Sequence, residues 1–73
     1  MNRQMLLDHL EEAERHVSNG ARLLERQRAI IDERRRDGHD VKRAEGMLET
    51  MQELQRMHIE HLATLRKELA QVG

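Results

Sequence analysis

The chain has 73 residues, of which 37% are charged and 37% hydrophobic, and its formal net charge is −1. Cysteine, tryptophan, tyrosine and phenylalanine are absent, which excludes disulfides and thiolate metal sites and removes the stacking platforms of single-stranded nucleic-acid modules. No apolar run approaches a membrane span and the first ten residues are too weakly apolar for a secretory signal, so we expect a cytoplasmic protein with one domain over residues 1–73.

A heptad seam predicts a first helix over about residues 3–36. Its members recur at alternating steps of four and three residues, the spacing that turns one stripe of a helix toward a partner helix. The polar residues Gln27 and Arg34 in this stripe, with Gln55 in the second half of the chain, are expected to fix register and partner number at some cost in stability. Gly20 is expected to leave room for the long side chain of Gln55 opposite it. The seam consists of Leu6, Leu10, Ala13, Val17, Gly20, Leu24, Gln27, Ile31 and Arg34.

The segment RRRDGHD, residues 34–40, interrupts the helical pattern and predicts a turn over residues 37–40. Gly38 can adopt the left-handed conformation just beyond a helix C-terminus, and Asp37 leads into it. Asp40 can cap the next helix by accepting hydrogen bonds from its first free amides. We therefore expect these three residues to form a corner.

The seam resumes after the corner and predicts a second helix over about residues 41–71. Facing members of the two seams have position numbers that sum to 75, so one fold point beside Gly38 brings every layer into register. The fold class we predict is all-α, an antiparallel two-helix hairpin with coiled-coil-like packing. The second seam consists of Val41, Ala44, Leu48, Met51, Gln55, His58, Leu62, Leu65, Leu69 and Val72.

One edge of this hairpin is more apolar than a two-helix seam requires. It carries Leu23 and Ile30 from the first helix beside Met47 and Leu54 from the second. Two hairpins packed through such an edge would form a four-helix bundle, so we expect a homodimer. The alternative is that these four are ordinary exposed apolar residues.

Four histidines fall at the end of the hairpin that carries the termini, and His16, His58 and His61 are the weak candidates for metal ligands. No His-x-x-x-His or Glu-x-x-His pair points inward, so we predict no metal and no cofactor. The histidines could instead be half-buried boundary residues, or an interface that repels itself when protonated. His39, in the turn, is expected to be solvated.

The turn end of the hairpin is basic. Residues 26–43 carry seven basic and four acidic side chains, a net charge of +3, and the remainder of the chain carries −4. Such an end could bind phosphate groups, although the interleaved acids could simply pair with the arginines. The candidate anion-binding residues are Arg34, Arg35, Arg36, Lys42 and Arg43.

Several short motifs together resemble a group of short, uncharacterised bacterial proteins of similar length that carry an RDGHD turn. The resemblance implies a stand-alone small bacterial helical hairpin and no known activity. The triple arginine before Asp37 departs from the group and puts a general role for the basic end in doubt. The matching motifs are ERH at 14–16, Gly20, ERQR at 25–28, RDGHD at 36–40, Gln55, His58 and His61.

Catalysis is not expected, because the chain has no thiol, no phosphate loop and only one serine, Ser18, with no base placed to activate it. The function we predict is a small non-catalytic interaction module, a homodimeric adaptor or regulator of a protein partner. The alternative is a hairpin dimer that binds nucleic acid weakly through its basic end. A third hypothesis is metal or pH sensing through the histidines.

Overall fold

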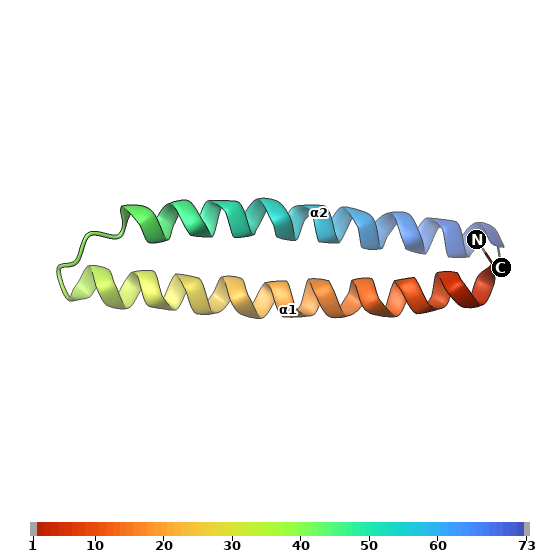
Figure 1. The fold of residues 1–73 in the computed structure, drawn as a ribbon, viewed down its shortest axis with the longest axis horizontal. Coiled ribbons are helices and arrows are strands. Elements are labelled where there is room, and N and C mark those ends of the chain that lie inside the picture. Colours follow the sequence, from red (N-terminus) through yellow and green to blue (C-terminus); the bar gives the residue numbers. More distant parts are fainter. Residues whose placement is uncertain (1, 73) are drawn as a thin grey trace.

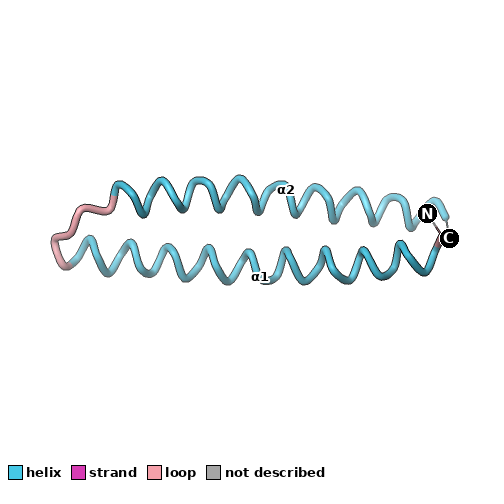
Figure 2. Tube along the Cα trace, viewed as in Figure 1, coloured by secondary structure: helices cyan, strands magenta, loops and turns pink. Residues whose placement is uncertain are grey.

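The computed structural model describes residues 2–72 and shows two long antiparallel helices joined by a short turn (Figure 1). Helix α1 is Arg3–Arg36 and helix α2 is Lys42–Val72. The two helices lie side by side along a rod of 54 × 14 × 13 Å, and both chain ends lie at the end opposite the turn (Figure 2). The predicted all-α helical hairpin is confirmed.

The first helix begins with a side-chain cap. The Asn2 side chain accepts a hydrogen bond from the backbone N–H of Met5 at 2.8 Å. An asparagine in this position satisfies one of the amides that the first helical turn leaves free, which is worth about 1 kcal/mol of helix stability.

The corner is a glycine-terminated helix end followed by a capped helix start. Gly38 has a φ of 80°, and its N–H donates to the carbonyl of Arg35 at 3.1 Å while the N–H of His39 donates to the carbonyl of Arg34 at 2.9 Å. This is the Schellman pattern. The Asp40 carboxylate then accepts a hydrogen bond from the N–H of Lys42 at 3.0 Å, as predicted for a residue that caps the second helix. Helix α2 begins at Lys42, one residue later than the predicted position 41.

The core is the predicted seam. The ten large apolar residues that we predict for the core are all buried or half-buried. Leu6, Ala13, Leu62 and Leu65 form a cluster of buried residues near the chain ends. Toward the turn, the buried side chains come from α1 alone, and the residues of α2 that face them are half-buried. The ten are Leu6, Leu10, Val17, Leu24, Ile31, Leu48, Met51, Leu62, Leu65 and Leu69.

Two glutamines in the seam join the helices by hydrogen bonds. The Gln27 amide donates to the carbonyl of Ala44 at 3.1 Å, and the Gln55 amide donates to the carbonyl of Val17 at 2.8 Å. The Gln55 amide lies against Gly20, where a Cβ atom would collide with it. Gly20 therefore provides the room that the long side chain needs.

The seam stops short at both ends. Arg34, predicted as its last member in the first helix, is exposed, because it lies level with Val41, which precedes α2 and presents no helical ridge to pack against. Val72, predicted as the last member in the second helix, is 51% exposed at the final residue of α2.

Candidate interaction surface

The four residues predicted for a dimer contact lie on one edge of the hairpin, called here the apolar edge: Leu23, Ile30, Met47 and Leu54. Leu23, Met47 and Leu54 are 54%, 58% and 52% exposed, and Ile30 is half-buried. Two shallow hollows along the edge are each lined from both helices, one between Leu23 and Leu54 and the other between Ile30 and Met47. The two rows of side chains therefore border one continuous surface.

Ion pairs cross the opposite edge of the hairpin, called here the polar edge. Arg66 of α2 lies 3.7 Å from the carboxylate of Glu14, and Arg35 of α1 lies 3.0 Å from that of Glu45. These are the ion pairs that join α1 to α2 within residues 2–72, and Arg35 lies one heptad beyond Arg28, the last α1 residue of this edge. Exposed pairs contribute little stability, but they mark a surface that faces water. The polar edge comprises Leu7, Glu14, Ala21, Arg28, Glu45, Gln52, Ile59 and Arg66.

Two other exposed methionines lie on the same side of the hairpin, outside the apolar edge and closer to the chain ends. Met57 lies three residues after Leu54 on α2, and Met5 lies four residues before His9 on α1, so helical spacing places both on the same side of the hairpin. They are 64% and 50% exposed. Methionine packs adaptably against irregular surfaces, which suits a contact face.

The histidines continue the same face toward the chain ends. His9, His16, His58 and His61 line an open groove of about 460 Å³, called here the histidine groove, together with Glu12. The rings of His16 and His58 stack with centroids 5.3 Å apart and an interplanar angle of 9°. The structure thus brings together the four histidines that the sequence placed at this end.

The histidine groove is not a preformed metal site. Over residues 2–72, no group of three or more histidine, aspartate or glutamate side chains is placed to bind a metal ion. The ring nitrogens of His16 and His58 point along parallel planes rather than toward a common point. Glu12 lies at the groove, with its carboxylate 3.6 Å from His16.

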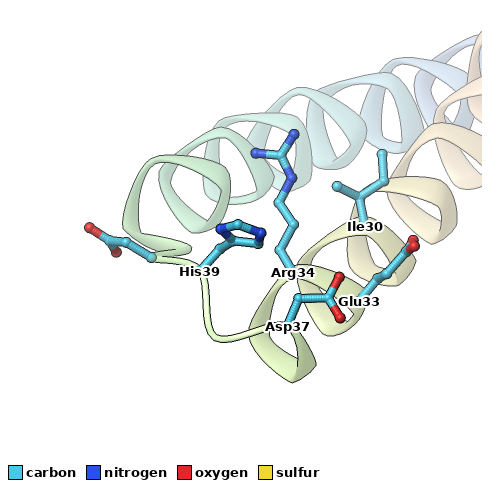
Figure 3. A pocket seen from close by; sticks show the side chains of 6 residues that line it. Ile30, Glu33, Arg34, Asp37 and His39 are labelled. Carbon is cyan, nitrogen blue, oxygen red and sulfur yellow. The ribbon is translucent and has the colours of Figure 1, made fainter.

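The five candidate anion-binding residues Arg34, Arg35, Arg36, Lys42 and Arg43 are all exposed, and the basic end is mixed in charge. Arg35 is already paired with Glu45, and the hollow at the turn is lined by three carboxylates, from Glu33, Asp37 and Asp40, against the single guanidinium of Arg34 (Figure 3). Arg34 also lines the hollow between Ile30 and Met47 together with Arg43, and no carboxylate from residues 2–72 lines that hollow. The structure thus brings two of the five candidates together and does not place the other three in that hollow.

Comparisons with known proteins found no matching family model, no matching curated protein and no matching solved structure. The resemblance to short bacterial hairpin proteins thus stays a prediction. Within residues 2–72, neither α1 nor α2 contains the long apolar stretch that a bilayer span requires.

Two features of the structure could not be predicted from the sequence. The heptad pattern puts His16 and His58 at similar levels, but the parallel stacking of their rings depends on side-chain torsions that spacing does not determine. The Gln55 side chain is 8% exposed, and its amide oxygen is buried with no hydrogen-bond partner. Position alone indicates a buried glutamine and not which of its atoms stays unpaired.

Proposed function

We propose that this protein is a non-catalytic helical interaction module that pairs with a second copy through the apolar edge to form a four-helix bundle. The dimer then serves as an adaptor or regulator of a protein partner. The observation that carries the proposal is the exposure of Leu23, Met47 and Leu54, each more than half accessible along one edge. A two-helix hairpin has no internal means of covering this edge.

The energetic reason is the gain from covering half-exposed apolar side chains. Full burial of a leucine or methionine is worth about 1.5–3 kcal/mol, and roughly half of that remains to be gained at each of these positions. The seam also has unfinished burial at the same place, since Met51 is only half-buried and lines the hollow between Leu23 and Leu54. A hairpin of this size benefits from any added core, because single small cores rarely supply more than a few kcal/mol.

The test compares two substitutions of equal exposure on opposite edges. Leu54 on the apolar edge is 52% exposed and Ile59 on the polar edge is 50% exposed. We expect Leu54→Lys to weaken self-association by on the order of tenfold or more. The substitution removes the gain from burying the exposed half of the leucine side chain and places a charge in the interface. Ile59→Lys should leave self-association unchanged. Sedimentation equilibrium of the two variants measures this, and a monomeric parent protein would refute the proposal.

A further inference from the structure

The apolar edge does not lie at the middle of the hairpin. Because facing residues of α1 and α2 have numbers that sum to 75, Leu54 lies level with position 21 and Met47 level with position 28 of α1. The apolar edge thus extends from level 21 to level 30, whereas α1 runs from 3 to 36. At a helical rise of 1.5 Å, the centre of the edge is displaced by about 9 Å from the centre of α1 toward the turn.

This displacement separates the two ways in which a second copy could cover the face. If the copies were turned end for end with full overlap, their apolar edges would be offset by about 18 Å, more than the ~14 Å that each edge spans. Each apolar edge would then lie over the histidine groove of the other copy. If both turns lie at the same end, the apolar edges face each other directly.

Sliding the reversed copies until their apolar edges meet would lose contact area. The face measures 54 by 14 Å, which is close to the ~800 Å² per partner that a standard stable interface buries. A slide of about 18 Å leaves roughly a third of that face uncovered and brings the contact below the standard size. When both turns lie at the same end, the two faces overlap over their full length and the two apolar edges contact each other.

Charge repulsion between two basic ends is the main argument against this arrangement, and it is the smaller effect. Exposed charges are screened beyond about 8 Å at physiological salt, and single exposed pairs are worth roughly 0.2–1 kcal/mol. A two-fold axis along the rod would also place α1 of each copy against α2 of the other. Glu33 of one copy then lies within one residue of the level of Arg43 of the second copy, which offsets part of the repulsion.

We propose, building on the homodimer proposed above, that two copies pack through the apolar edge with their turns at the same end. Leu23 and Ile30 of each copy then contact Leu54 and Met47 of the other. The histidine grooves of the two copies face each other near the chain ends and form one chamber lined by eight imidazoles, four from each copy.

The orientation can be measured directly because the chain contains no cysteine, so single-cysteine variants accept one spin label per copy. His39→Cys labels the turn through an exposed side chain, and Ser18→Cys labels an exposed position near the middle of the rod. Copies with their turns together should give turn labels within about 30 Å of each other, since neighbouring helices pack 8–10 Å apart. Reversed copies should give turn labels separated by nearly the 54 Å length of the rod.

The label at Ser18→Cys distinguishes a wrong orientation of the two copies from the absence of a dimer. Labels at Ser18 lie near each other in both arrangements, so a short Ser18→Cys distance reports pairing alone. A short middle distance with distant turn labels would overturn the orientation and leave the proposed dimer intact. The absence of dipolar coupling at both positions, with a monomeric mass, would overturn the dimer and the orientation together.

Discussion

The side-chain amide of Gln55 occupies the space that a Cβ atom at position 20 would need, and Gly20 leaves that space free. The amide is held there by its hydrogen bond to the carbonyl of Val17 at 2.8 Å. We therefore expect Gly20→Ala to destabilise the protein by up to about 2 kcal/mol, because displacing a buried amide costs about 1–3 kcal/mol and alanine gains roughly 1 kcal/mol over glycine in a helix.

Gly46 provides the matched control, because it also lies within a helix but an added Cβ would meet nothing within 4 Å. Gly46→Ala should stabilise by up to about 1 kcal/mol. In a Gln55→Ala background, Gly20→Ala should become stabilising as well, since the obstructing amide is gone. Chemical denaturation at one fixed protein concentration measures all of these variants. If Gly20→Ala stabilises the parent as much as Gly46→Ala does, the packing explanation is wrong.

The Gly20 and Gln55 pairing shows why so much of this fold is predictable. The two residues face each other because their numbers, like those of the other seam pairs, sum to 75, and that rule needs only helical periodicity and one glycine corner. The structure departs from the rule where a residue lacks a partner. Arg34 has no helical ridge opposite it, and Val72 lies at the last residue of its helix.

The candidate surface is less predictable for a physical reason. The position of Leu54 on an apolar edge follows from helical spacing, and so does the number of histidines near the chain ends. The stacking of His16 on His58 does not, because it depends on side-chain torsions and on solvent. The identity of whatever covers the apolar edge is not encoded by the periodicity of one chain at all.

The glycine at the corner should be far less replaceable than the glycine inside α2. Gly38 has a φ of 80°, a conformation that costs an L-residue roughly 1 kcal/mol or more even though the surrounding space is open. We expect Gly38→Ala to lower the unfolding free energy by about that amount and Gly38→Asn by less, because asparagine tolerates the left-handed region. Thermal unfolding at fixed concentration compares them. Equal stability of Gly38→Ala and the parent protein would argue that the turn relaxes to another conformation.

Nucleic-acid binding through the basic end should be weak and dominated by salt. Three carboxylates share the turn hollow with Arg34, and Arg35 is paired with Glu45, so few positive charges are free to displace counterions. We expect a gel shift with RNA or DNA only at low salt and none near physiological ionic strength. Robust binding at 0.15 M salt that disappears when Arg34, Arg35 and Arg36 are changed to alanine would instead favour the nucleic-acid alternative.

The dimer should weaken on acidification. The proposed chamber brings eight imidazoles together, and protonated imidazoles would repel one another across the contact. We therefore expect weaker association in acid than at neutral pH. The groups that face one another in each groove are His9, Glu12 and His16 from α1 and His58 and His61 from α2.

Glu12 moderates this effect without cancelling it, since one carboxylate lies beside four imidazoles in each copy. We expect the dissociation constant at pH 5 to exceed that at pH 7.5 by on the order of tenfold, equivalent to about 1.4 kcal/mol, as measured by sedimentation equilibrium. Changing His16 and His58 together to glutamine should flatten the pH dependence, because glutamine keeps much of the bulk and cannot acquire the charge. His39→Gln, at the opposite end, should retain the full dependence. If the double variant dissociates with acid as readily as the parent protein, groups other than these stacked histidines govern the response.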